Sequence, residues 1–210
     1  MPQEPAVKRT TVFVDGQNLF YGAREAFGYT YPNYDPLALA QRVCQDKGWH
    51  FSQVRFYTGI PDPSVNAAWH GFWTRKLAVM GTRAIWSFTR PLRYRLETVT
   101  QADGTESTVF VGREKGIDVR LALDVVRLAR SGMLDVALIF SQDQDLSEVA
   151  DEVRAISMQE NRWLKIACAF PGSPTSRNKR GINGADWIRF DKATYDTCID
   201  PNDYRGGSTP

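Results

Sequence analysis

The sequence predicts an α/β fold in which a mostly parallel sheet is covered on both faces by helices and carries a β-hairpin insertion. Apolar, β-branched runs alternate along the chain with segments whose apolar residues recur at helical spacing, which is typical of βαβ crossovers. These runs are nearly continuous, as expected for strands buried on both faces. The pair Asp103-Gly104, between two alternating segments, is a strong hairpin signal.

Each element rests on a local pattern. Apolar and β-branched runs predict strands at 10–15, 51–58, 84–88, 134–140, 163–170 and 186–190. Helical spacing predicts helices at 18–27, 35–47, 62–80, 116–130 and 146–158. The second of these helices begins with a favourable N-cap and a first-turn proline, Asp35 and Pro36. The hairpin strands are expected at 92–100 and 107–112.

Length and composition favour one globular domain. A chain of 210 residues is long enough to bury a core of its own, and its 42% hydrophobic content excludes a disordered chain. We expect an N-terminal extension at 1–9, one domain at 10–195 with the hairpin inserted at about 92–112, and a C-terminal tail at 196–210. The tail is expected to be disordered after Pro201.

The sequence also limits the cellular compartments and the kinds of partner that we expect for the protein. It shows no apolar leader at its N-terminus and no apolar run long enough to cross a bilayer. Its three cysteines are far apart and odd in number, so they match neither a disulfide framework nor a zinc pair. We therefore expect a cytoplasmic protein without a membrane partner. The net charge of +2 does not by itself indicate nucleic acid, but it does not show where the charges lie.

Carboxylates follow the predicted strands at the edge where open parallel sheets bind ligands. Asp15 ends the first strand, and Asp118 lies in the first turn of the helix after the hairpin. Asp143 and Asp145 follow a later apolar strand. If the chain stays extended there, Ser141, Asp143 and Asp145 point to one side. The pattern predicts a cluster of four carboxylates.

Such a cluster needs a counter-charge. At an effective dielectric of about 20, two unit charges about 4 Å apart repel by about 4 kcal/mol. The carboxylates therefore take up protons or bind a divalent cation, and an all-oxygen ligand set favours Mg²⁺ or Mn²⁺ over zinc. A cation bound there lowers the pKa of a bound water and offsets phosphate charge, which favours phosphodiester hydrolysis.

Each carboxylate also has a purely structural explanation. Asp15 can begin a turn or cap the following helix, and Asp118 is favourable in a first turn because of the helix dipole. Asp143 or Asp145 can serve as an N-cap. The predicted constellation is therefore more specific than any of its members.

Two further residues are weaker candidates for site support. Asp124 lies four residues after Arg120 and three before Arg127, a spacing that favours a solvated stripe of salt bridges. Lys115 precedes the helix that carries Asp118, where it would stabilise phosphate charge or be an ordinary surface lysine.

Three segments resemble the motifs of NYN domains, the LabA-like branch of the PIN-like nuclease superfamily. They are Val14-Asp15-Gly16-Gln17-Asn18, Glu114-Lys115-Gly116-Ile117-Asp118-Val119 and Ser141-Gln142-Asp143-Gln144-Asp145. They follow the family elements V-D-G-x-N, K-G-x-D-V and S-G-D-x-D in the same order, and the resemblance spans residues 10–190. Gln142 stands where the family usually has glycine, so the turn there must suit a residue with a Cβ.

The resemblance implies a Rossmann-like three-layer α/β/α sandwich of the PIN-like type and a metal-dependent ribonuclease. By motif position, the acidic residues that would bind Mg²⁺ or Mn²⁺ and act in catalysis are Asp15, Asp118, Asp143 and Asp145. Asn18 would orient a ligand or water, and Ser141 would support the loop.

Basic residues gather in two stretches that contain no acid, 63–96 and 161–185. The first includes Arg93 and Arg95, which are also explained as a solvated strand face. The second includes a loop flanked by glycine, serine and proline that has no packing role, with Arg177, Lys179 and Arg180. Such stretches beside an acidic site favour RNA phosphate contacts.

Aromatic residues are interleaved with the first basic stretch. Exposed aromatic rings stack single-stranded bases. The helical spacing of Trp69, Phe72, Trp73 and Leu77 instead favours a place for this stripe in the core.

Together these features predict a Mg²⁺- or Mn²⁺-dependent endoribonuclease that activates water for in-line attack on single-stranded RNA and leaves 5′-phosphate products. A homodimer is one candidate state. The main alternative is a non-catalytic RNA-binding or regulatory scaffold. A phosphatase acting on small phosphoesters ranks third, because the first strand lacks a D-x-D-x-[TV] signature.

Overall fold

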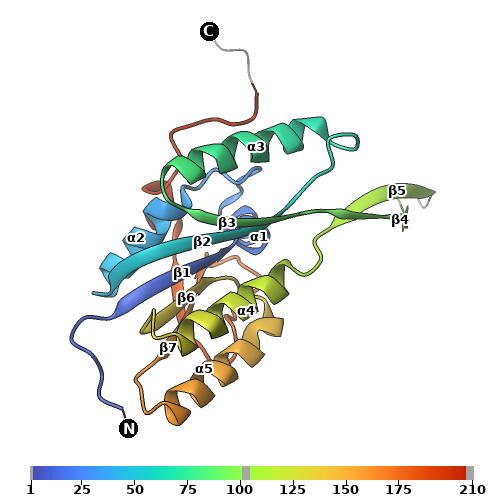
Figure 1. Ribbon diagram of the computed structural model, residues 1–210. Coiled ribbons are helices and arrows are strands. Elements are labelled where there is room, and N and C mark those ends of the chain that lie inside the picture. The colour runs from blue at the N-terminus through green and yellow to red at the C-terminus, as the bar shows by residue number, and fades with distance from the viewer. Residues whose placement is uncertain (1, 101–104, 207–210) are drawn as a thin grey trace.

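The computed structural model describes residues 2–100 and 105–206, and its centre is a six-stranded sheet (Figure 1). The strand order is β3-β2-β1-β6-β7-β8, and every neighbouring pair is parallel. The strands are β1 (Arg9–Asp15), β2 (His50–Ile60), β3 (Trp86–Pro91), β6 (Val136–Phe140), β7 (Lys165–Pro171) and β8 (Asp186–Phe190). From β1 the chain adds β2 and β3 on one side, and it then adds β6, β7 and β8 on the other side. The strand order therefore reverses between β1 and β6, as in doubly wound, Rossmann-like folds.

Helices cover both faces of this sheet, which confirms the three-layer α/β/α sandwich. One face packs against α1 (Gly16–Phe27), α2 (Pro36–Asp46) and α3 (Ala67–Thr82). The other packs against α4 (Ile117–Arg130) and α5 (Ser147–Gln159), and Figure 1 shows α3 and α5 on opposite sides of the strands. Alternate side chains of β1 enter the two cores, Val12 and Val14 on one side and Phe13 on the other.

The hairpin forms a small sheet of its own and projects from the body of the molecule (Figure 1). Its strands are β4 (Arg93–Thr100) and β5 (Glu106–Arg113), paired antiparallel with Leu96 opposite Phe110. The predicted Asp103-Gly104 turn lies outside the described residues. The insertion enters the chain between β3 and α4, so β5 leads directly into the segment that carries Asp118.

Several predicted boundaries are wrong. The strands expected from 134 and 163 begin at Val136 and Lys165, and two further errors arise where the local backbone conformation overrides the apolar spacing. Asp62 begins a turn instead of a helix, since it accepts bonds from the backbone N–H groups of Val65 and Asn66. The helix α3 begins only at Ala67, where the side chain of Asn66 caps it by accepting the Trp69 N–H (3.1 Å). The strand predicted at 84–88 begins at Trp86, because Ala84 adopts a left-handed conformation with φ of 56°.

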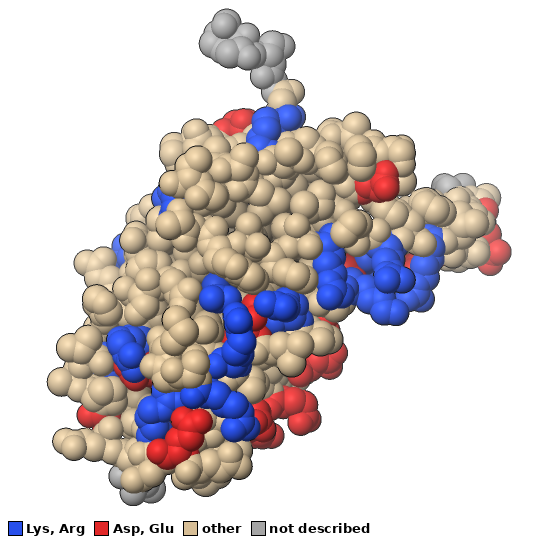
Figure 2. All heavy atoms as spheres, viewed as in Figure 1, with Lys and Arg blue, Asp and Glu red and all other residues tan. Residues whose placement is uncertain are grey.

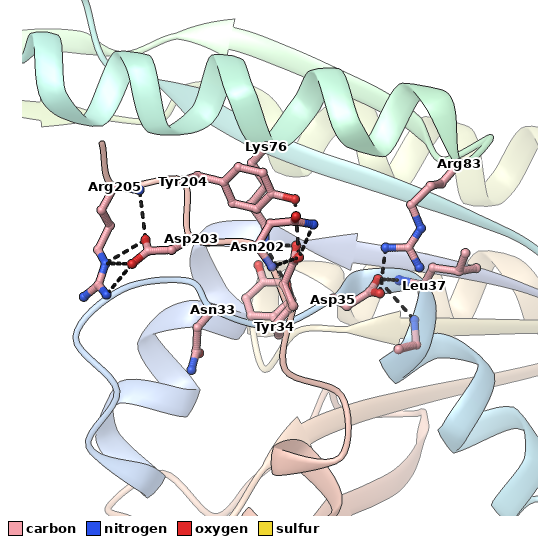
Figure 3. A network of polar contacts seen from close by, with 12 residues as sticks. Asn33, Tyr34, Asp35, Leu37, Lys76, Arg83, Asn202, Asp203, Tyr204 and Arg205 are labelled. Atoms are coloured by element: carbon pink, nitrogen blue, oxygen red, sulfur yellow. Dashed lines mark hydrogen bonds and ion pairs between the residues drawn. The ribbon is translucent and has the colours of Figure 1, made fainter. Parts of the chain in front are cut away.

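The predicted disorder after Pro201 is wrong for residues 202–206. A short helix that was not predicted, α6 (Lys192–Asp196), precedes this segment, and Tyr204 is buried against Phe72 of α3. The fully buried ammonium group of Lys76 binds the carboxylate of Asp200 (3.1 Å) and the backbone oxygen of Tyr34 (2.7 Å). Figure 3 shows Lys76, Tyr34 and Tyr204 in this network. The C-terminal segment is therefore part of the fold up to Gly206.

The sequence-based expectations for the cysteines are confirmed, and those for the aromatic stripe are confirmed in part. The three cysteines are buried and free, so they form no disulfide. Of the aromatic stripe, Phe72 and Trp73 are buried, whereas Trp69 and Leu77 are half-buried and pack against the core. Within the described part of the chain, no helix has the length and apolar character needed to span a bilayer.

Candidate active site

The carboxyl ends of β1 and β6 meet at the point where the strand order reverses, and polar side chains gather there. Asp15 is the last residue of β1, and Ser141 directly follows β6. The two are joined by a hydrogen bond from the Ser141 hydroxyl to Asp15 Oδ2 (3.4 Å). The same hydroxyl accepts the backbone N–H of Asp143 (3.1 Å). Ser141 therefore connects the carboxylate of Asp15 with the backbone of Asp143.

The N-terminus of α1 is fastened to the loop after β6. Asp15 caps this helix by accepting the Asn18 N–H (3.0 Å), so its structural role as an N-cap is real. The side-chain oxygen of Asn18 accepts the backbone N–H of Gln142 (2.9 Å). Asn18 thus positions the loop that carries Asp143.

The expected extended run through Asp145 is wrong from residue 144 onward. A 3₁₀ turn, η1 (Gln144–Leu146), begins there, and Asp143 caps it by accepting the Asp145 N–H (3.1 Å). Because the turn redirects the chain, Asp145 is exposed and does not line the cavity that contains Asp143. The role of Asp145 as a ligand stays a prediction.

The first turn of α4 forms the opposite wall of the site. Gly116 is its N-cap and adopts a left-handed conformation with φ of 72°, which glycine tolerates best. A Cβ at this position would lie 2.6 Å from the guanidinium of Arg90. The bend at Gly116 places half-buried Asp118 and exposed Lys115 at the same cavity.

Glu114 is a site residue that the sequence-based prediction missed. Its Oε1 accepts the backbone N–H of Gly59, in a short hydrogen bond, and lies 3.4 Å from the Thr58 hydroxyl, which donates to it. Both partners belong to the end of β2. The available signal was the position of Glu114 directly before Lys115, at the end of a predicted hairpin strand.

Burial gives two of these carboxyl groups unusual proton affinity. It raises the pKa of Asp15 to about 6, and the negative charges of Asp143 and Asp118 add to the rise, against hydrogen bonds from Asn18 and Ser141. Burial also raises the pKa of Glu114 to about 7, with the charges of Asp15 and Asp118 acting in the same direction. The site therefore contains more negative charge than its own protein groups offset.

These residues line one cavity of about 380 Å³. Its acidic members come from three separate segments of the chain and are Asp15, Glu114, Asp118 and Asp143. Lys115 is its basic member, and Gln17, Asn18 and Tyr21 complete the side of α1. The cavity thus unites three of the four predicted acids with Asn18 and Lys115.

The donor set fits a hard divalent cation, since it consists of carboxylate oxygens whose mutual repulsion a cation relieves. Across residues 2–100 and 105–206, however, no three His, Cys, Asp or Glu side chains stand close enough together to hold one ion. The chemistry of the donors therefore fits the group, while binding requires the carboxylates to move closer together.

Asp124 is not part of a solvated stripe, so that expectation is wrong. Its side chain is 1% exposed and lies between α4 and β2. It accepts a hydrogen bond from the Tyr57 hydroxyl (3.0 Å) and forms ion pairs with three arginines, Arg55, Arg120 and Arg127. The helical spacing predicted Arg120 and Arg127 as partners of Asp124. Its other partners, Arg55 and Tyr57, lie on β2, far away along the chain. Asp124 does not line the acidic cavity.

The basic loop after β7 lies against the site. The amide of Gln142 donates to the backbone oxygens of Asn178 (3.4 Å) and Arg180 (2.8 Å). Gln142 keeps a negative φ, so the residue that replaces the family's glycine suits its turn and anchors this loop. The side chains of Arg177, Lys179 and Arg180 are exposed.

The hairpin supplies a second group of cations. Arg93 and Arg95 are exposed on β4, and neither forms an ion pair with another described residue. Figure 2 shows Lys and Arg side chains gathered along the hairpin and on the adjoining face of the body. Their position therefore agrees with both a solvated strand face and a surface for phosphates.

A parallel sheet of this strand order, with an acidic cavity where the order reverses, defines a Rossmann-like protein of the PIN-like type. The NYN domain family matches residues 9–161, which is most of the chain. The protein therefore belongs to the NYN family, a nuclease-type family of the PIN-like nuclease superfamily. These nucleases generally use divalent metals.

Solved structures support the fold. A protein of unknown function from Vibrio parahaemolyticus RIMD 2210633 is 18% identical, with a TM-score of 0.53, and the match covers 90% of this chain and 97% of that one. MurG from Acinetobacter baumannii is 8% identical with a TM-score of 0.34, covering 87% and 45% of the two chains, a likeness too weak to support an inference. The comparison with curated proteins gave no match.

Proposed function

We propose that the protein is a divalent-metal-dependent endoribonuclease that hydrolyses single-stranded RNA. One observation carries the proposal: carboxylates from three separate chain segments line one cavity at the carboxyl edge of a parallel sheet. Such an arrangement is unfavourable for folding because it buries like charges, so a role in binding explains it better than stability does. Membership of the NYN family supports the same chemistry.

In this proposal Asp15, Glu114, Asp118 and Asp143 hold the cation. When bound, Mg²⁺ or Mn²⁺ supplies a more acidic water and offsets the charge of the phosphate. Asp145 is a further candidate ligand by motif position only. Attack in line with the leaving 3′-oxygen leaves a 5′-phosphate on the product.

The surrounding residues then have distinct tasks. Asn18 and Ser141 keep Asp15 and Asp143 in position through the hydrogen bonds described above. Lys115 and the N-terminus of α4 face the cavity and attract the anionic phosphate. Asp124 acts at a distance by fixing α4 against β2.

The RNA strand would pass between the two cationic surfaces. Arg177, Lys179 and Arg180 lie in the loop that Gln142 anchors beside Asp143. Arg93 and Arg95 lie on the hairpin, whose second strand leads into Glu114. Both groups can neutralise backbone phosphates without reading the sequence. A cytoplasmic location and a homodimeric state remain predictions.

Cleavage of a labelled single-stranded RNA in Mn²⁺ tests the proposal. The wild type is compared with Asp15→Asn and Asp143→Asn, and with Asp46→Asn as a matched control. Asp46 pairs with Arg42 at the end of α2, before β2 begins, and so lies at the opposite edge of the sheet. We expect the two site variants to lose activity and the control to keep it. Equal activity in all four proteins would refute the nuclease assignment.

A non-catalytic RNA-binding scaffold is the second candidate. It is favoured by the observation that, within the described residues, no three potential ligands are close enough to hold an ion. Binding of the same RNA without cleavage, equal with Mn²⁺ and with EDTA, would select the scaffold.

A further inference from the structure

A second cavity lies beside the acidic one. It has a volume of about 300 Å³ and is enclosed by α1, α3, the end of β2 and the base of the hairpin. Both cavities are lined by Gln17 and Tyr21. The two spaces are therefore neighbours, and one ligand can occupy both.

The lining of the second cavity differs in kind from that of the first. Its side chains include four aromatic rings, Phe20, Tyr21, Trp69 and Trp73. None of its described lining residues is acidic, and Arg24 is basic. The lining thus combines aromatic rings with polar side chains and, among the residues that the structure describes, contains no acid, which suits a flat organic group with polar edges better than a metal ion.

Three groups at this cavity have no structural task within the fold. Tyr21 is 53% exposed, with its ring 5.4 Å from that of Phe20. Within the described part of the chain, the side chains of Gln17, Tyr21 and Arg24 have no hydrogen-bond or ion-pair partner. An exposed ring, a free amide and a free guanidinium at one cavity are available to a ligand.

Gly59 and Glu114 form the wall between the cavities. Gly59 lines the aromatic cavity, Glu114 lines the acidic one, and the Gly59 N–H donates to the Glu114 carboxylate. A Cβ at position 59 would lie 2.4 Å from the side chain of Leu92 and 2.7 Å from Glu114 Cγ. Glycine is therefore required for the close approach that makes this partition thin.

We propose that the aromatic cavity binds an unpaired nucleobase of the nucleotide next to the phosphate at the acidic site. This inference rests on the proposed function and deepens it, because it states where the site holds a base and why the strand must be unpaired. Aromatic faces stack any base, and Gln17 can pair with a base edge. Arg24 is placed to meet the adjoining phosphate. A base held in a duplex is stacked and paired and so cannot enter, which makes single-stranded RNA the substrate.

The binding test uses a fluorescent single-stranded oligoribonucleotide and the Asp143→Asn background, so that the strand stays intact. Stacking on one aromatic side chain contributes about 1–3 kcal/mol, which is a factor of about 5 to 160 in affinity. We expect Tyr21→Ala to weaken binding by that factor, and Tyr21→Phe to stay within about twofold because the ring is retained. Since Tyr21 is exposed, its loss should leave thermal stability unchanged, and a melting curve checks this.

A strand with one abasic nucleotide identifies the contact. We expect an abasic nucleotide at one position to weaken RNA binding by the protein that retains Tyr21. The same nucleotide should have little further effect on binding by Tyr21→Ala, since both changes remove the same contact. Effects that multiply would overturn the inference, and so would duplex RNA that binds as tightly as the single strand.

The two proposals can fail separately. If the effects of Tyr21→Ala and the abasic nucleotide on binding are coupled while the wild type does not cleave RNA in Mn²⁺, the base site stands and the nuclease assignment is refuted. Cleavage without such coupling would retain the nuclease and refute the base site.

Discussion

Removing the charge of Asp15 should stabilise the fold while it abolishes cleavage. The carboxyl is 7% exposed, and burial together with the charges of Asp143 and Asp118 raises its pKa to about 6. An Asp15→Asn substitution removes the buried charge and keeps an oxygen that can cap α1, since Asn and Asp are equally good N-caps. The change therefore isolates the electrostatic cost of the site.

The size and sign of the effect follow from the pKa. A rise from 3.8 to about 6 corresponds to about 3 kcal/mol, at 1.36 kcal/mol for each pKa unit. Because the folded state binds this proton more tightly than the unfolded chain, the contribution of Asp15 to stability is greatest below pH 4 and is lost as pH rises through 6. We expect the free energy of unfolding of Asp15→Asn to exceed that of the wild type by up to about 3 kcal/mol at pH 7.5, and to equal it near pH 4.

Urea unfolding in EDTA, followed by tryptophan fluorescence across this pH range, measures the difference. Asp46→Asn is again the control. Mn²⁺ should then stabilise the wild type and reduce its deficit, because ligand binding to the folded state adds to the free energy of unfolding. A variant that is less stable than the wild type at pH 7.5, or a difference independent of pH, would refute the reasoning.

Two further predictions concern the buried ion pair and the basic loop. Asp200→Asn leaves the buried ammonium of Lys76 without its carboxylate and should lower the free energy of unfolding in urea by about 3–5 kcal/mol. Adding Lys76→Met should restore most of this loss. A loss under about 1 kcal/mol in Asp200→Asn would contradict the prediction. Replacing Arg177, Lys179 and Arg180 with Gln should reduce the slope of log affinity against log salt for single-stranded RNA by about 2, at about 0.7 for each phosphate contact. Arg42→Gln should leave that slope unchanged, and an unchanged slope in the triple variant would place the RNA elsewhere.

Most elements could be predicted because their signals are local. Asp35 caps α2 through the N–H groups of Leu37 and Ala38, as its place before Pro36 indicates. Within the apolar run at 134–140, Val136–Phe140 forms the fully buried β6. The errors at Asp62 and Ala84 arose where short-range hydrogen bonds bend the backbone, which apolar spacing does not record.

The site was predicted in part for the same reason. Asp15 and Asp143 follow strands, and parallel strands end at one edge, so their convergence follows from fold class. Glu114 was missed because its burial depends on Thr58 and Gly59, the latter 55 residues away along the chain. Asp124 was misplaced because Arg55 and Tyr57 reach it from β2, far from α4 along the chain.

The sequence alone thus establishes the features that depend on residues close together along the chain. These are the order of the motifs, the positions of most strands and helices, and the acids at the strand ends. The raised pKa values of Asp15 and Glu114, the aromatic cavity beside them and the ordered C-terminal segment depend on contacts between distant segments. Burial and electrostatic energy are set by everything that surrounds a group. Only the tertiary structure, which brings those segments together, could decide them.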